Sequence, residues 1–287
     1  MRSMILRSMR SYMIEVKANK LSLDMSDWNP PLLALAIPLD IDDIHRSIYI
    51  ARGLKIDRVD ELAIDISTKF NPDLICIIIP EGVESGSFDR YVDLSLSILD
   101  GVGKPSIILA ADSASSRSIL EGIVEKAGEY ELIIGPADMG NYRTYTALAS
   151  IYTQNLLARS TTDINQAKQL IQLIVDTGFP IERITLDIAS TGLGLGLEDT
   201  YNLIEQAKLL YGRGDPILSI PIVAFTWEAW DSFEVYLDDL SISRGMVWEM
   251  ITASAYILSS VDIIVLLDPE VLLYARRLIG ELSRREV

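Results

Sequence analysis

The chain is poor in the side chains that bind metals and form disulfides. Its 287 residues include one cysteine, Cys76 in the apolar run LICIIIP, and one histidine, His45. A single cysteine excludes an intramolecular disulfide, and it excludes a zinc site or an iron–sulfur cluster held by cysteines of this chain alone. Inside an apolar run, a lone cysteine is usually a small buried hydrophobic residue.

Histidine chemistry would depend on His45 alone, either as a general base or as an axial metal ligand. Its neighbours Asp42, Asp43 and Arg46 favour a histidine on the surface of a helix. A Ser/His/Asp triad would have to use His45, and the Gly-x-Ser-x-Gly sequence of a nucleophile elbow does not occur. We therefore expect no hydrolase chemistry of this kind, and we predict no metal site in this chain.

Basic residues and long hydrophobic runs are also scarce. There are 25 Lys and Arg residues against 41 Asp and Glu, a formal net charge of −16. Such a surface repels phosphate backbones, so we expect no nucleic-acid partner. No run reaches the roughly 18 apolar residues that a membrane span needs, and no signal-peptide core follows the first residues. These patterns predict a cytoplasmic protein without a membrane segment.

Eight apolar runs typical of buried strands recur along the chain, and amphipathic helical patterns lie between them. The runs cover residues 32–39, 74–80, 105–111, 131–136, 155–160, 184–188, 217–225 and 262–267. Alternating strands and helices predict an α/β fold with a parallel sheet, and eight such units predict a (β/α)8 TIM barrel.

The helical patterns can be checked in two segments. Apolar residues fall near one face in 59–70 and again in 165–178. Asp163 and Gln166 have the spacing of a capping box, and Gly178 stands where the second helix should end. Both segments therefore predict helices that pack against a barrel.

The domain organisation follows from the absence of a linker. No stretch rich in Pro, Ser or Gly appears after about Leu32, whereas the residues before it are basic and rich in methionine. We predict a single TIM barrel over residues 31–287, preceded by an N-terminal extension over residues 1–30.

The most informative segment is TLDIASTGLGLGLEDTY, residues 185–201. An expected strand ends at Asp187, a glycine loop follows, and a helix starts near Glu198. The loop glycines are Gly192, Gly194 and Gly196. Barrels place ligands at the carboxyl ends of their strands. Asp187 could accept two parallel hydrogen bonds from an amino-pyrimidine or pterin edge, or it could accept bonds from free amides of the loop, the role we favour.

The sequence of the glycine loop does not predict a nucleotide-binding site. Its Gly-x-Gly-x-Gly spacing differs from the dinucleotide fingerprint, and no basic residue follows to hold a phosphate. Leu193, Leu195 and Leu197 alternate with the glycines. The loop therefore packs inward as core, the more common case, or outward onto a partner or an apolar ring system.

Other residues are expected near the same end of the barrel. Asn141 follows the fourth expected strand, and Asn165 and Lys168 lie three residues apart on the first turn after the fifth. They either contact a ligand or form ordinary solvated turns. Trp227 and Trp230 follow the seventh strand, where large aromatic residues usually bury against loops or a partner and only occasionally stack on a flat cofactor.

Several uncommon strings, in the same order and covering nearly the whole expected barrel, resemble the small (delta) subunit of the acetyl-CoA decarbonylase/synthase and corrinoid iron–sulfur protein family. They are LLALAIPLD at 32–40, PDLICI at 72–77, GNY at 140–142, DINQAKQL at 163–170, LDIASTGLGLGLEDTY at 186–201, GDPILSIPIVAFTWEAW at 214–230, RGMVWEMITA at 244–253 and VDIIVLLDPE at 261–270. At Gln154, Ile188, Asp199 and Asp268 the chain departs from the residues usual in that family, as a diverged member would.

The resemblance implies a TIM barrel that pairs with a large subunit carrying an iron–sulfur domain and a corrinoid. In this hypothesis the chain binds no cofactor alone, the partner supplies the cobamide, and methyl groups pass through the complex in the acetyl-CoA pathway. The segment from Asp187 to Glu198 and the rim at Trp227 and Trp230 would dock the partner. The barrel would act as a subunit without catalytic residues of its own.

Two alternatives remain open. In the first, the chain is an enzyme similar to pterin-dependent methyltransferases, and Asp187, Asn141 and Asn165 bind the edge of a methyl-tetrahydropterin. In the second, the barrel is a homo-oligomer. Its hydrophobic content of 49% is high for a soluble chain of this size, and a buried interface between subunits would account for part of it.

Overall fold

The computed structural model describes residues 4–7, 21–24, 30–83, 86–111, 113–128, 130–237 and 241–283. Within this part of the chain, eight parallel strands form one closed barrel in the order β10-β3-β4-β5-β6-β7-β8-β9. The strands are β3 (Leu32–Pro38), β4 (Leu74–Ile79), β5 (Ser106–Ala110), β6 (Ile133–Ala137), β7 (Asn155–Ser160), β8 (Ile184–Ile188), β9 (Ile222–Phe225) and β10 (Ile263–Leu266). The prediction of a (β/α)8 barrel is confirmed.

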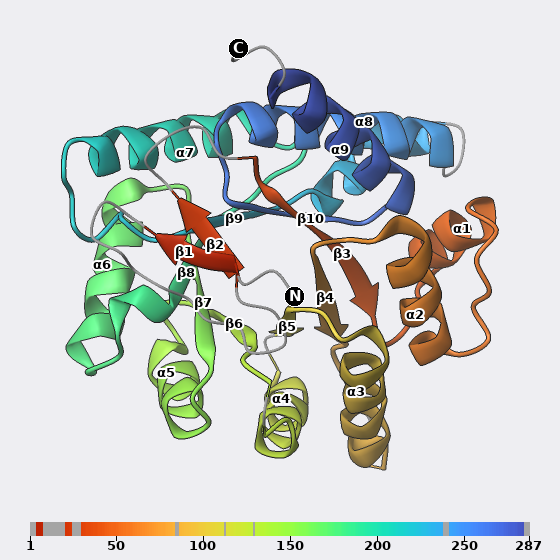
Figure 1. Ribbon diagram of the computed structural model, residues 1–287, viewed down its shortest axis with the longest axis horizontal. Helices are drawn as coiled ribbons and strands as arrows, with labels where there is room; N and C mark the ends of the chain where they lie inside the picture. Colours follow the sequence, from red (N-terminus) through yellow and green to blue (C-terminus); the bar gives the residue numbers. More distant parts are fainter. Residues whose placement is uncertain are drawn as a thin grey trace.

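Helices surround the barrel (Figure 1). They are α1 (Asp43–Ala51), α2 (Val59–Phe70), α3 (Phe88–Val102), α4 (Ala114–Lys126), α5 (Tyr142–Ile151), α6 (Ile164–Asp176), α7 (Leu197–Gly212), α8 (Ile242–Leu258) and α9 (Pro269–Ser283). Short 3-10 helices η1 (Ile181–Arg183), η2 (Trp227–Asp231) and η3 (Phe233–Tyr236) lie in the connections. None of the described helices is both long and apolar enough to cross a membrane.

Burial on both faces explains why the strands are continuous apolar runs. Every residue of β3, β5 and β8 is buried, because one face of each strand lines the barrel interior and the other contacts the helices. Cys76 in β4 is fully buried, as expected, and burial raises the pKa of its thiol. The core is therefore shared between the inside of the barrel and the ring of helices.

The α6 segment confirms half of the expected capping box. Asp163 accepts hydrogen bonds from the backbone N–H of Asn165 at 2.7 Å and of Gln166 at 3.4 Å. The Gln166 side chain does not return the interaction to Asp163; instead it accepts a bond from Thr161 Oγ1 at 2.7 Å. Gly178 has a φ of +91°, which a glycine adopts readily beyond the end of a helix.

The strand expected over 217–225 begins later than its apolar pattern suggests. β9 starts at Ile222, and Pro221 precedes it with no N–H to donate to a neighbouring strand. Asp215 organises the preceding turn by accepting from the backbone N–H of Ile217 and Leu218. The long apolar run therefore divides into a turn and a short strand.

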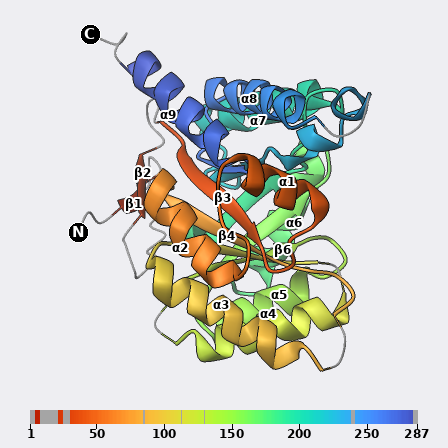
Figure 2. The same cartoon turned by 90° about the vertical axis from the view of Figure 1, so that its right-hand side faces the viewer.

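The N-terminal extension expected over residues 1–30 lies mostly outside the described residues. Within it, β1 (Met4–Arg7) and β2 (Leu21–Asp24) pair in parallel as a separate two-stranded sheet. Figure 2 shows this pair at one end of the barrel and not in its wall.

Candidate functional site

Asp187 lies at the end of β8 and is only 1% exposed. Its Oδ2 accepts a 2.5 Å bond from Arg159 Nε, and its Oδ1 accepts from the backbone N–H of Ser190 at 3.1 Å and from Ser190 Oγ at 2.6 Å. Arg159 stands directly opposite Asp187 in the register of β7 and β8. Both carboxylate oxygens thus already have donors, one of which is a loop amide.

The Arg159 guanidinium packs against the ring of Phe225, which in turn packs against the ring of Trp227. The guanidinium carbon lies 5.3 Å from the ring centre of Phe225, at the end of β9. Phe225 in turn contacts Trp227, with ring centres 4.5 Å apart and planes tilted by 36°. This stacking holds the guanidinium plane in place through the cation–π attraction between a cation and an aromatic face.

A cavity of about 200 Å³ opens at this end of the barrel. It is lined by Arg159, Asp187, Ala189, Ser190, Thr191, Phe225, Trp227 and Glu228. Glu228 is half-buried, and burial together with the charges of Asp187 and Asp231 raises its pKa, against the opposing effect of Arg159. The cavity therefore combines one cation, two carboxylates and an aromatic wall.

The glycine loop packs in both of the ways that its sequence allows. A Cβ on Gly192 would lie 2.2 Å from the backbone nitrogen of Ala229, so only glycine permits this close approach to η2. Leu193 packs against the core and Leu197 is buried, whereas Leu195 between them is 44% exposed. The loop is thus part core and part surface.

Two side chains of α8 hold the start of this loop. Tyr256 Oη accepts from the backbone N–H of Thr191 at 3.1 Å and donates to the carbonyl of Thr191 at 2.5 Å. Thr252 Oγ1 accepts from the backbone N–H of Leu193 at 3.0 Å. The loop after Asp187 is therefore fixed by α8 as well as by its own strand.

Trp230 is buried, as the commoner interpretation of a rim tryptophan predicts. Its Nε1 donates to Glu249 Oε2 at 2.8 Å, and Thr226 Oγ1 donates to Glu249 Oε1 at 2.7 Å. Burial and the charge of Asp268 raise the pKa of Glu249 to about 7. A Cβ on Gly245 would lie 2.2 Å from the Trp230 ring, so α8 leaves room for the indole.

The remaining predicted residues lie outside the lining of this cavity. Asn141 shapes the turn before α5, where its Oδ1 accepts from the Asp138 N–H at 2.8 Å. Asn165 is exposed on the first turn of α6, and Lys168 pairs with Asp215 at 2.6 Å. Glu198 is exposed on the first turn of α7. The structure thus joins Asp187 and its loop to Trp227, but it does not bring the two asparagines into the same cavity wall.

His45 is not on the open surface, contrary to the interpretation from its neighbours. It is 9% exposed at the start of α1, and its Nδ1 lies 2.7 Å from Asp42 Oδ1. Asp42 also caps α1 by accepting from the His45 backbone N–H, so one carboxylate holds both groups. Within the part of the chain that the structure describes, no group of three or more His, Cys, Asp or Glu side chains is placed to hold a metal ion.

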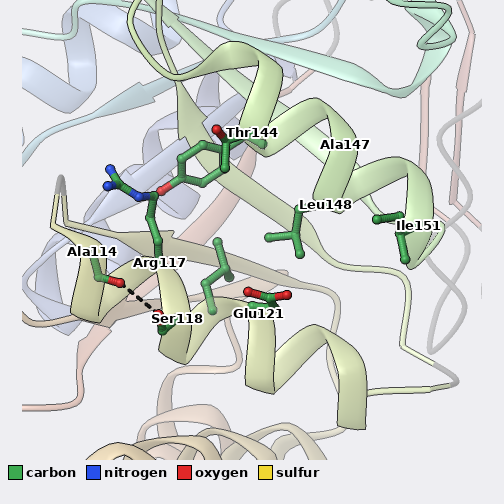
Figure 3. Close-up of a pocket in the computed structure, with 10 residues that line it drawn as sticks. Ala114, Arg117, Ser118, Glu121, Thr144, Ala147, Leu148 and Ile151 are labelled. Carbon is green, nitrogen blue, oxygen red and sulfur yellow. Dashed lines mark hydrogen bonds between the residues drawn. The ribbon is translucent and has the colours of Figure 1, made fainter. Parts of the chain in front are cut away.

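A larger groove of about 380 Å³ lies outside the barrel, between α4 and α5 (Figure 3). Leu148 and Ile151 of α5 face Arg117, Ser118 and Glu121 of α4 across it. The only bond drawn there joins Ser118 Oγ to the carbonyl of Ala114 at 3.0 Å, within α4 itself. None of the residues that line the mouth cavity also lines this groove, so the groove is separate from the candidate site.

The sequence patterns missed Arg159, Phe225 and Tyr256. Arg159 carries a signal, because a charge at the end of the apolar run NLLARS is costly to bury without a partner. Phe225 and Tyr256 carry none, since both fit the pattern of ordinary core residues. Only the register of neighbouring strands places Arg159 opposite Asp187.

Comparison with known proteins points to one family. A family model described as the CO dehydrogenase/acetyl-CoA synthase delta subunit matches residues 17–277. The chain is 29% identical to the acetyl-CoA decarbonylase/synthase complex subunit delta of Methanothermobacter thermautotrophicus, over 66% of this chain and 50% of that protein. It is 23% identical to the same subunit of Archaeoglobus fulgidus, over 87% of this chain and 56% of that protein. The chain spans about half the length of these relatives.

Among solved structures, the barrel is similar to Yersinia pestis dihydropteroate synthase bound to a pterine-sulfa conjugate. The TM-score is 0.61 and the identity is 14%, over 91% of this chain and 96% of that chain. At this identity the likeness shows the fold alone.

Proposed function

Because this chain belongs to the CO dehydrogenase/acetyl-CoA synthase delta subunit family, we propose that it is a barrel subunit without catalytic residues of its own. It docks a corrinoid-carrying large subunit while methyl groups are transferred in the acetyl-CoA pathway. The cobamide belongs to the partner, and this chain contributes the surface against which the partner rests.

The observation that carries this proposal is an exposed apolar patch beside the glycine loop. We call it the rim patch; it consists of Leu195, Phe233, Tyr236 and Leu237. Phe233 is 75% exposed, and Gly194 lies against Ser232 and Glu234, which brings the loop next to η3. Large exposed apolar side chains on neighbouring segments mark a site of protein interaction more often than a random surface does.

The glycine loop gives the rim patch a rigid base. Thr191 and Leu193 are bonded to α8, and Gly192 is pressed against η2, so Leu195 projects from an anchored segment. A preorganised surface loses little conformational entropy when a partner binds. This rigidity favours docking over an internal lid that opens and closes.

Co-purification with a large-subunit homologue tests the docking proposal. The wild-type chain should retain the cobamide-carrying partner, measured by corrinoid absorbance in the eluate, whereas Leu195→Asp should reduce the retained amount at least about tenfold. Leu273→Asp on α9 is the matched control, because Leu273 is also an exposed leucine and lies far along the chain from the rim patch. Equal retention by the two variants would exclude docking through the rim patch.

A second candidate function is the binding of a methyl-tetrahydropterin at the mouth. The cavity beside Asp187, with its Phe225 and Trp227 wall, supports a flat ligand, and a protein of similar fold binds a pterine conjugate. Asn141 and Asn165 would have to reach the ligand from outside the cavity wall. Calorimetric titration of the methyl-tetrahydropterin decides it: heat is expected with wild type and a large loss with Asp187→Asn. No heat with wild type removes this candidate.

A further inference from the structure

Two charged side chains in the mouth cavity have polar atoms that make no hydrogen bond to any described residue. Arg159 uses Nε for Asp187, and neither of its two Nη groups bonds to any described residue, although the side chain is only 36% exposed. Glu228 is half-buried and forms no hydrogen bond or ion pair with the described residues. Both groups line the same cavity without pairing with each other.

An unpaired, half-buried carboxylate weakens the folded protein. Glu228 loses hydration by burial and lies near Asp187 and Asp231, and only Arg159 offsets this repulsion. Residues that cost stability without an internal partner are characteristic of functional sites. Arg159 is likewise held with its outer edge free, because Asp187 and the Phe225 ring fix the rest of the guanidinium.

We propose that this cavity binds a small molecule in which a hydrogen-bond acceptor stands next to a donor, with Arg159 and Glu228 as the binding residues. Arg159 Nη groups donate to the acceptor, and the Glu228 carboxylate accepts from the donor. The ligand lies against Trp227 and Phe225. Cyclic amides and amino-acid zwitterions share this chemistry.

The size and charge of the cavity narrow the ligand class. A volume of about 200 Å³ holds roughly seven water-sized groups, enough for a single six-membered ring or a small amino acid. Simple anions fit poorly, because two carboxylates and one guanidinium line the cavity. This inference rests on the second candidate function for the location of the site, because both use the same cavity. The binding residues proposed here are different, and the ligand need not be a pterin.

The test is a calorimetric titration of the intact chain with 2-pyridone and, separately, with glycine. Binding of either probe supports the proposal, and the responding probe identifies the source as a cyclic amide or a zwitterion. 2-Methoxypyridine and acetate are the matched control probes, because each has the acceptor without the adjacent donor. Absence of binding by both 2-pyridone and glycine, or equal binding by the control probes, overturns the proposal.

Variants test the two residues. Glu228→Gln should weaken binding of the responding probe about tenfold or more, and it should raise the Tm of the free protein because a repelled carboxylate is removed. Arg159→Lys keeps a cation near Asp187 but loses the planar outer edge, so it should also weaken binding. Glu205→Gln, an exposed residue of α7, is the control and should change neither property.

The outcomes separate this inference from the second candidate function. If a probe binds but the methyl-tetrahydropterin does not, the second candidate function is excluded and the small-molecule site proposed here is supported. A response to the pterin that Glu228→Gln and Arg159→Lys both leave unchanged supports the second candidate and overturns the roles assigned here. A lower Tm for Glu228→Gln would show that Glu228 has a structural partner, and it would also overturn the proposal.

Discussion

Single buried charges hold the carboxyl end of the barrel together through specific partners. Asp268 is fully buried after β10 and accepts two bonds from Arg52, from Nε at 2.9 Å and from Nη2 at 2.5 Å. Glu270 contacts the same guanidinium at 3.1 Å but is largely exposed. The two carboxylates share one arginine but differ in burial. Their ion pairs should therefore contribute very different amounts to the free energy of unfolding.

Arg52→Ala should lower the free energy of unfolding by about 3–5 kcal/mol, because it leaves the buried Asp268 carboxylate without its counter-charge. Urea denaturation monitored by circular dichroism measures the loss. Glu270→Gln removes only the exposed contact and should change stability by less than about 1 kcal/mol. Similar losses in both variants would show that burial does not control the strength of these pairs.

Glu249 should make stability depend on pH near neutrality. Its pKa is about 7 in the folded protein and near the ordinary 4.5 in the unfolded chain. Between these values the folded state holds a proton that the unfolded state has lost, so stability from this group is greatest below 4.5 and falls as the pH rises through 7. The donors Thr226 and Trp230 moderate this effect, because they stabilise the ionised form.

We therefore expect the stability difference between wild type and Glu249→Gln to shrink as the pH rises from about 5 to about 8. Denaturation curves at several pH values for both proteins measure it. The Glu249→Gln curve serves as the baseline for wild type, because the two proteins share all other titrating groups. A difference that stays constant over this range would mean that Glu249 is already ionised in the folded protein and that its donors outweigh burial.

The role of Asp187 could be narrowed from the sequence but not decided. The sequence places it beside a glycine loop at the end of a strand and predicts that it accepts bonds either from loop amides or from a pterin edge. The structure gives it the amide and hydroxyl of Ser190 together with Arg159. Arg159 lies 28 residues away along the chain, and only strand register brings the two charges together. Such a pairing leaves no local pattern.

At the scale of elements, periodic segments were predictable and turns were not. α2 has the expected bounds, because its apolar residues repeat with the helical period over its whole length. The run over 217–225 misled the strand prediction, since hydropathy does not reveal that Asp215 and Pro221 shape a turn before β9. The rim patch was also invisible, because η3 and the glycine loop meet only in the folded barrel.

The bonds from α8 should control how often the glycine loop opens locally. Tyr256→Phe removes both bonds to Thr191 without changing the packing of the ring. Loss of about 1 kcal/mol should raise local opening about fivefold. Hydrogen exchange of the Thr191 and Leu193 amides measures this. The control is Tyr274→Phe, which removes a 3.3 Å contact between Tyr274 of α9 and Ser254 of α8. It should leave the exchange rates of the loop amides unchanged.

A uniform rise in exchange over the whole barrel would contradict this expectation. It would mean that Tyr256 stabilises the fold globally and not the loop locally. Local loosening should also weaken partner retention, because Leu195 would lose its anchored base. The Tyr256→Phe variant thus links the rigidity of an element to the proposed docking.

For the whole molecule, the acidic surface opposes the compact state. A formal net charge of −16 on 287 residues makes folding bring like charges together. Arg52 and Arg159 pair with fully buried carboxylates, so solvent ions screen these two pairs less than they screen the exposed carboxylates. Added salt should therefore relieve repulsion at the surface more than it weakens attraction in the interior.

We expect the Tm of the isolated chain to rise when NaCl increases from about 0.01 M to about 0.2 M, because the screening length falls from roughly 30 Å to below 10 Å. Glu121 and Glu125 are both exposed on α4, one helical turn apart, and repel each other. Glu125→Lys turns this repulsion into an attraction, so it should raise the Tm at low salt and reduce the response to NaCl. A wild-type Tm that falls with NaCl would show that attraction between surface charges outweighs the repulsion caused by the net negative charge.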